Sequence, residues 1–128
     1  MRALVVDDSR AMRMILSRLL GRIGFEVAEA VDGVDALEQL EAADEAPAVA
    51  LVDWNMPRLN GLDLIKEVRR RPKFSRMTLM MVTTEGEQAQ IVRALAAGAH
   101  EYVIKPFTAD AIEEKLELLG LVPAGAAE

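Results

Sequence analysis

The feature of this sequence that most restricts its fold is the alternation of short apolar runs with amphipathic segments. The apolar runs are too short for helices and are rich in Val, Leu and Ile, which is typical of strands buried on both faces of a sheet. They cover residues 3–6, 27–30, 48–52, 79–82 and 102–104. Between them, apolar residues recur at helical spacing, as in Met12, Ile15, Leu16, Leu19 and Ile23. The alternation predicts an α/β protein of five βα units, with helices on both faces of a parallel sheet.

Turn and capping residues mark the ends of the predicted helices. Gly33 opens the second helical segment, Pro72 ends the third, and Gly98 ends the fourth. Residues 84–87 read Thr-Glu-Gly-Glu, which predicts a capping box with Thr84 as the cap of the fourth helix.

Composition limits the classes of function. The 128 residues are 52% hydrophobic and 28% charged, as in ordinary globular proteins, and they contain no cysteine, which excludes disulfides and thiolate zinc sites. A formal charge of −6 argues against nonspecific nucleic-acid binding, and no apolar run approaches the ~20 residues of a membrane span. We expect one cytoplasmic, monomeric domain over residues 1–122, a frayed tail over 123–128, and no nucleic-acid or membrane partner.

Polar residues follow four of the predicted strands at the point where each strand ends. The first strand leads into Asp7 and Asp8, the third into Asp53, the fourth into Thr83 and the fifth into Lys105. Because the carboxyl ends of parallel strands share one edge of the sheet, these side chains are expected to converge. Each has a simpler explanation when taken alone, such as a helix cap or a solvated lysine, but their coincidence favours a functional site.

The convergent residues predict phosphoryl chemistry. Three carboxylates so close together repel one another unless a proton or a cation joins them, and Mg²⁺ is the hard cation that takes carboxylate oxygens and still binds a phosphate oxygen. Lys105 and the hydroxyl of Thr83 complete a receptor for a phosphoryl group. The acceptor is expected to be an aspartate, which can attack phosphorus and become an acyl phosphate.

These residues resemble a known family. Asp7-Asp8, Asp53, Thr83 and Lys105-Pro106, in this order and on a chain of this length, are similar to the receiver domain of bacterial two-component response regulators. The segments at 53–57, 81–85 and 102–107 resemble the receivers of chemotaxis regulators in particular. The resemblance covers nearly the whole chain. It implies a flavodoxin-like, three-layer (βα)5 fold with a five-stranded parallel sheet in the order 2-1-3-4-5.

The resemblance also implies a role for each site residue. Asp53 would be phosphorylated from the phosphohistidine of a histidine kinase. Asp8, Asp53 and the backbone carbonyl of Asn55 would hold Mg²⁺, with Asp7 acting mostly through water. Thr83 and Lys105 would contact the phosphoryl group.

Further expectations from the resemblance concern tuning and geometry. Asn55 and Glu85 occupy the two positions that tune dephosphorylation in this family. The Lys105–Pro106 peptide bond is expected to be cis.

The resemblance implies that this protein is a switch with no enzymatic activity beyond its own phosphorylation and dephosphorylation. Thr83 and Tyr102 would form the switch pair. The output face would lie on the fourth helix, fifth strand and fifth helix, at Gln90, Ile91, Ala94, Tyr102 and Lys115. We expect no DNA-binding domain after Leu121, and therefore output through a protein target, such as a flagellar switch protein.

Three alternatives remain beside chemotaxis. The first is a phosphorelay intermediate that passes the phosphoryl group to another histidine. The second is an aspartate-nucleophile phosphohydrolase, which needs Asp-x-Asp after the first strand; the adjacent Asp7 and Asp8 disfavour it because alternate side chains point apart. The third is a nucleotide-binding protein, which is disfavoured because acids after the first strand repel phosphate unless a metal intervenes.

Overall fold

The computed structural model describes residues 1–121, so the expected tail at 123–128 lies outside the described residues. The elements are β1 (Arg2–Val6), α1 (Arg10–Ile23), β2 (Glu26–Ala30), α2 (Gly33–Ala42), β3 (Val49–Val52), α3 (Gly61–Arg69), the 3-10 turn η1 (Pro72–Phe74), β4 (Thr78–Thr83), α4 (Gln88–Ala97), β5 (Glu101–Ile104) and α5 (Ala109–Leu118). The five strands form one parallel sheet in the order β2-β1-β3-β4-β5. The predicted fold and strand order are therefore confirmed.

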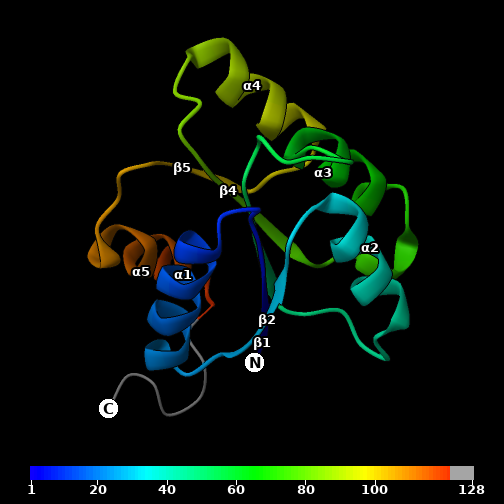
Figure 1. Cartoon of the computed structure of the whole chain (residues 1–128), viewed down its shortest axis with the longest axis horizontal. Coiled ribbons are helices and arrows are strands. Elements are labelled where there is room, and N and C mark those ends of the chain that lie inside the picture. Colours follow the sequence, from blue (N-terminus) through cyan, green and yellow to red (C-terminus); the bar gives the residue numbers. More distant parts are fainter. Residues whose placement is uncertain (122–128) are drawn as a thin grey trace.

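The helices form two layers on the sheet. Figure 1 shows α1 and α5 together on one side of the sheet, with α2, α3 and α4 on the other. Strand side chains alternate between the two layers: Val5, Leu51 and Met80 pack beneath α1 and α5, whereas Val6 and Val52 pack beneath the other three helices. Two apolar cores therefore lie back to back, as expected when both faces of a parallel sheet are covered.

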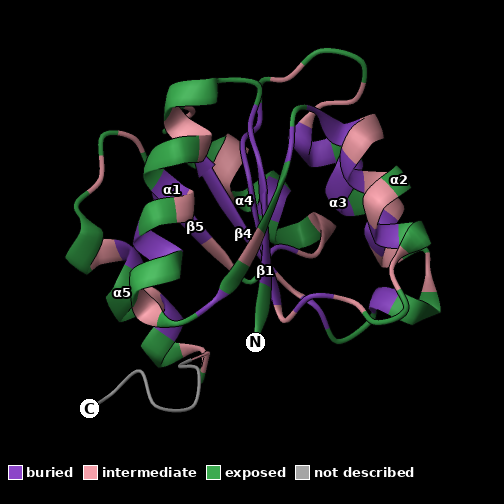
Figure 2. Cartoon of the chain, turned by 60° about the horizontal axis from the view of Figure 1, so that its bottom comes forward, coloured by how far each residue is buried: buried purple, intermediate pink, exposed green. Residues whose placement is uncertain are grey.

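The strand β2 differs from the prediction of strands buried on both faces. Glu26, Ala28 and Glu29 are exposed, and only Ala30 is fully buried. The strand lies at the edge of the sheet and pairs with β1 alone. Figure 2 shows the contrast with the buried central strands.

The start of α4 also differs from the prediction. The N-cap is Glu87, whose side chain makes no capping hydrogen bond, so the assignment of Thr84 as the cap is wrong. The segment between β4 and α4 is held by a tertiary contact, in which the Tyr102 hydroxyl donates to the backbone carbonyl of Glu85. The N-cap therefore lies three residues later than the capping pattern indicates.

The other turn and capping residues lie where the sequence predicts them. Gly33 is the first residue of α2, and Gly98 follows α4 in a positive-φ conformation. The helix α3 ends at Arg69, and Pro72 begins the short 3-10 turn that follows it. Within the described residues, no helix is both long and apolar enough to span a membrane.

Candidate functional site

Three aspartates meet at the carboxyl edge of the sheet. Asp7 and Asp8 directly follow β1 and Asp53 directly follows β3, and carboxylate oxygens of all three lie within 4.8 Å of one another. The backbone N–H of Asp53 donates to the carbonyl of Val6 at 2.9 Å, which continues the strand pairing and aligns the two strand ends. Asp7 and Asp53 are buried, whereas Asp8 is exposed. The structure therefore brings Asp53 close to Asp7 and Asp8, although the sequence separates it from both by 45 residues or more.

Asp7 is fixed from several directions. Its Oδ1 accepts from the backbone N–H of Ser9 at 2.9 Å, and its Oδ2 lies 2.9 Å from the Nζ of Lys105. Its backbone carbonyl accepts from Arg13 Nη1 at 2.8 Å. The role of Arg13 was missed from the sequence, since a surface arginine on a helix carries no signal of where its side chain reaches.

Lys105 supplies the positive charge of the site. It directly follows β5, and its Nζ lies 3.7 Å from Asp53 Oδ1 as well as close to Asp7. The Lys105–Pro106 peptide bond is cis, as expected. A half-buried lysine between two buried carboxylates partly offsets their charge.

The acid–base state of Asp53 reflects this setting. Burial raises the pKa of the Asp53 carboxyl and the nearby charge of Asp7 raises it further, whereas Lys105 and the hydroxyl of Thr83 act in the opposite direction. Thr83 is the last residue of β4 and is fully buried. Three carboxylates and one lysine leave an excess of negative charge and several oxygen donors, which is the donor set that a hard divalent cation such as Mg²⁺ prefers.

The loops around the aspartates are linked to each other. Asn55 Nδ2 donates to Glu85 Oε1 at 2.8 Å, which joins the loop after β3 to the loop after β4. Tyr102 is buried, with 8% of its surface exposed, and its hydroxyl contacts the Glu85 carbonyl. Trp54, next to Asp53, is also buried, and the Arg93 guanidinium lies 5.8 Å from the centre of its ring.

The residues expected on the output face are not equally accessible. Gln90 and Ile91 are partly exposed, and Lys115 is partly exposed and pairs with Glu101 at 3.1 Å. Ala94 has no exposed surface, because α4 packs on the sheet through this residue, and Tyr102 is also buried. Neither side chain is accessible in this conformation, and their place on the output face stays a prediction.

Four exposed large apolar side chains lie on α4, β5 and α5, the elements expected to form the output face. They are Val92 and Leu95 on α4, Ile104 on β5 and Leu118 on α5. The apolar residues of α4 therefore do not all face the core.

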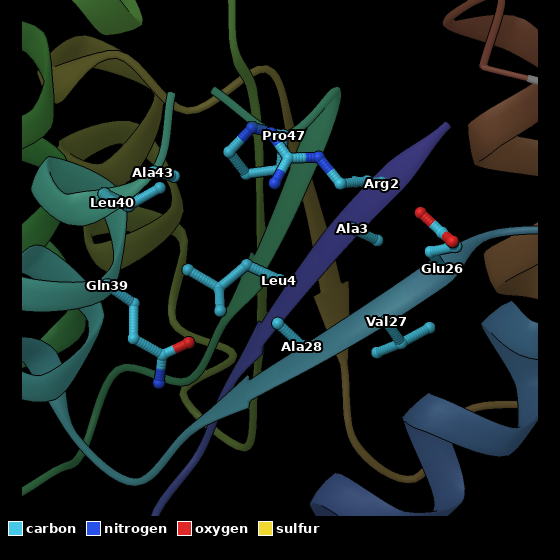
Figure 3. Close-up of a pocket in the computed structure, with 10 residues that line it drawn as sticks. All are labelled: Arg2, Ala3, Leu4, Glu26, Val27, Ala28, Gln39, Leu40, Ala43 and Pro47. Carbon is cyan, nitrogen blue, oxygen red and sulfur yellow. The ribbon is translucent and has the colours of Figure 1, made fainter. Parts of the chain in front are cut away.

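A separate cavity of about 210 Å³ lies beside β1, β2 and the end of α2 (Figure 3). Its lining consists mainly of small and aliphatic side chains, among them Leu4, Val27, Ala28 and Leu40. It shares no residue with the aspartate cluster, which lies at the other ends of these strands. The pocket is therefore separate from the candidate site at the carboxyl edge.

Comparisons with known proteins agree with this architecture. The family described as response regulator receiver domain matches residues 3–117. The chain is 48% identical over 120 residues to the chemotaxis protein CheY1 of Helicobacter pylori, covering 93% of this chain and 96% of that protein. It is 48% identical over 118 residues to a chemotaxis protein CheY homolog of Campylobacter jejuni, covering 91% of this chain and 90% of that protein.

A solved structure shows the same fold. The chemotaxis protein CheY4 of Vibrio cholerae superposes with a TM-score of 0.84 at 32% identity, covering 91% of this chain and 96% of that chain. A family match over most of the chain, two similar relatives and a common fold point to the same conclusion. This protein belongs to the response regulator receiver family.

Proposed function

We propose that this receiver domain accepts a phosphoryl group on Asp53 from the phosphohistidine of a histidine kinase, in a reaction that requires Mg²⁺. The observation that carries the proposal is the convergence of Asp7, Asp8 and Asp53 with the amino group of Lys105. Asp8, Asp53 and the backbone carbonyl of Asn55 would hold the cation. When bound, Mg²⁺ would neutralise charge on the phosphoryl oxygens and on the carboxylates.

With Mg²⁺ bound, the transfer would use Asp53, Lys105 and Thr83. A carboxylate oxygen of Asp53 forms a bond to phosphorus while the phosphorus–nitrogen bond to the donor imidazole breaks, and the imidazole leaves. Lys105, 3.7 Å from Asp53 Oδ1, would pair with a phosphoryl oxygen, and the Thr83 hydroxyl would donate to another. The raised pKa of Asp53 means that the magnesium-free carboxyl is more readily protonated, so cation binding would favour the nucleophilic form.

The output of this switch is proposed to be a protein contact in chemotaxis. The relatives with 48% identity carry chemotaxis names, and four exposed large apolar side chains lie on α4, β5 and α5. The target would be a protein of the flagellar switch, which would bind when Asp53 is phosphorylated. The beryllofluoride adduct, an acyl-phosphate analogue, should therefore increase retention of a purified candidate switch protein in a pull-down.

The acceptor is tested by substitution. Asp53→Asn keeps the size of the side chain and removes the nucleophile, so labelling by a phosphorylated kinase or by acetyl phosphate should disappear. Asp44→Asn makes the same change at an exposed position outside the site and should label normally. Phosphate that appears on a serine or threonine of Asp53→Asn would contradict the proposal.

The cation is tested through Trp54, the only tryptophan, which adjoins Asp53. Millimolar Mg²⁺ should change its fluorescence, and Asp8→Ala should abolish the response. A titration curve that is unchanged in Asp8→Ala would remove Asp8 from the metal site.

A further inference from the structure

Arg58 adopts a backbone conformation that side chains rarely take. Its φ is 67°, in the left-handed region that favours glycine, and it is the one non-glycine residue with positive φ among the described residues 1–121. It lies in the loop between β3 and α3, three residues after Asn55. A residue held in this region needs contacts that stabilise it there.

The side chain of Arg58 provides such a contact. Its Nε donates to Asp32 Oδ2 at 2.7 Å and its Nη2 donates to Asp32 Oδ1 at 3.0 Å, which makes a two-point pair. The carboxylate end is nearly buried, with 7% of the Asp32 side chain exposed. Two-point arginine–carboxylate pairs fix orientation as well as distance. Hydrogen bonding to the Arg58 guanidinium also lowers the pKa of Asp32, so the carboxylate stays ionised at neutral pH.

Asp32 is itself a rigid anchor. It is the N-cap of α2, and its Oδ1 accepts from the backbone N–H of Asp35 at 2.8 Å. The Asp35 carboxylate in turn accepts from the backbone N–H of Val31 at 2.9 Å. These reciprocal bonds tie the carboxylate to the first turn of a helix.

A second observation shows that the loop rests directly on this anchor. A Cβ atom added to Gly33 would lie 2.4 Å from the backbone oxygen of Leu59, so the loop backbone occupies space that only a glycine leaves free. At the other end of the loop, the backbone N–H of Gly61 donates to the carbonyl of Trp54 at 2.8 Å. The segment that carries Asn55 is therefore held at both ends.

We infer that Arg58 is a positioning residue for the metal site, and that its pair with Asp32 fixes the loop so that Asn55 presents its backbone carbonyl beside Asp8 and Asp53. The inference rests on the proposed function, which assigns that carbonyl to Mg²⁺. Arg58 touches neither the cation nor the phosphoryl group in this account. It acts through the loop, as outer groups around metal ligands do.

The test measures Mg²⁺ affinity by isothermal titration calorimetry on the full chain. Arg58→Gln removes the two-point pair, and Arg58→Gly removes it while retaining a residue that favours the left-handed backbone. Asp32→Asn removes the charge and keeps a good helix cap. Each should raise the Mg²⁺ dissociation constant about ten-fold, the low end of the range for groups that support metal ligands.

A double substitution and a matched control test whether Arg58 and Asp32 affect Mg²⁺ affinity through their contact with each other. Arg58→Gln combined with Asp32→Asn should bind Mg²⁺ no more weakly than either single variant, because both remove the same contact. Arg70→Gln makes the same chemical change in an exposed pair with Glu67 and should bind like the wild type. Arg58→Lys, which keeps the charge without the two-point geometry, should recover only part of the affinity.

The outcomes separate the two proposals. Folded Arg58 variants that bind Mg²⁺ like the wild type would overturn the positioning role alone, as would additive losses in the double variant. A wild-type protein that binds no Mg²⁺ would refute the proposed site and, with it, this inference. Native circular dichroism of each variant before titration excludes loss of affinity through unfolding, and Arg58→Lys replaces any variant that fails this check.

Discussion

Two aspartates of the candidate site are buried. Asp7 and Asp53 lie out of water with Lys105 as their shared counter-charge. Burying charges costs stability unless they are paired and hydrogen-bonded. Asp7 meets this condition through Ser9 and Lys105, whereas the raised pKa of Asp53 shows that its charge is less well compensated. The less well compensated of these two carboxylates is also the proposed nucleophile, as expected for a group that would receive a cation and a phosphoryl group.

His100 leads to a pH prediction at the scale of single residues. Its Nδ1 accepts from the backbone N–H of Leu79 at 3.2 Å and lies 3.2 Å from Arg69 Nη2, so the ring is neutral in this arrangement. Partial burial and the Arg69 charge lower the pKa of His100 below its usual value of about 6.5. The unfolded chain therefore takes up the proton first, and the free energy of unfolding should fall as pH drops below that usual value.

The measurement compares urea unfolding at pH 7.5 and pH 5.5. His100→Asn places a non-titrating acceptor near the position of Nδ1, so this variant should lose less stability between the two pH values than the wild type. Equal losses in both proteins would mean that His100 does not contribute to the acid sensitivity.

Among the elements, α4 is the helix with the weakest local anchoring. Its N-cap, Glu87, makes no capping hydrogen bond through its side chain, whereas the side chains of Ser9, Asp32, Asn60 and Thr108 cap the other four α-helices. Its one fully buried residue is Ala94, and large apolar side chains on its outer surface are exposed. Few buried contacts and weak capping are features of segments that open at low free-energy cost. A helix of this kind, next to the proposed site, is suited to respond to phosphorylation.

The capping of α4 can be tested directly. Glu87→Asp keeps the charge and brings a carboxylate within reach of the free N–H groups of the first turn, so it should raise the free energy of unfolding by about 0.5–1 kcal/mol. Thr84→Ala should change it by less than about 0.5 kcal/mol, because Thr84 is exposed and caps nothing. Urea denaturation measures both, and a large loss in Thr84→Ala would restore the capping box predicted from the sequence.

Substitution of two glycines by alanine should change the free energy of unfolding in opposite directions. A Cβ on Gly61, the first residue of α3, would lie 2.1 Å from the backbone oxygen of Asp53. Gly61→Ala should therefore displace the backbone at Asp53. We expect it to lower the free energy of unfolding by about 1–3 kcal/mol and to weaken Mg²⁺ binding.

Gly21→Ala is the matched control, since nothing lies within 4 Å of a Cβ at this position in α1. This change should raise the free energy of unfolding by about 0.5–1 kcal/mol through helix propensity. Thermal and urea unfolding would measure the stability of both variants. If Gly61→Ala were stabilised as Gly21→Ala is expected to be, the close approach at Gly61 would be contradicted.

Across the whole molecule, one chain of contacts joins the site to the proposed output face. Thr83 ends β4 beside Asp53, and its Oγ1 accepts from the backbone N–H of Glu85 at 3.4 Å. The carbonyl of Glu85 accepts from the hydroxyl of Tyr102 on β5. A shift of Thr83 towards a phosphoryl group would act on both neighbours. Tyr102 is buried in the present conformation, which is one of the two positions that a switch of this type requires.

The coupling is tested with variants that leave the acceptor intact. Thr83→Ala and Tyr102→Ala should still be labelled by acetyl phosphate, because Asp53 and Lys105 remain. Phosphorylation should then change their affinity for the target by less than about two-fold, whereas coupled sites typically change affinity by about 5–150-fold. Binding assays with and without beryllofluoride measure this ratio. A wild-type ratio in both variants would show that the signal leaves the site by another route.

The sequence alone determines the fold class and the composition of the site. Short apolar runs separated by amphipathic segments admit few arrangements, and the polar residues at the strand ends are brought to one edge by parallel topology. For this reason Asp7 and Lys105, 98 residues apart, were expected to meet, and they lie 2.9 Å apart. The resemblance to a family added the strand order and the cis bond, and the structure confirms both.

Only the tertiary structure decides features that depend on contacts between distant elements. An apolar repeat does not show how much of a helix its neighbours cover, so the burial of Ala94 and the exposure of Val92 became visible only once α4 was packed on the sheet. In the same way, no local pattern shows that Arg58 pairs with Asp32. An arginine side chain is long, and the tertiary fold decides which carboxylate lies within its reach. The residue types at the strand ends predict the chemistry of the site, whereas the contacts that hold the site in place and its exposure to solvent depend on packing.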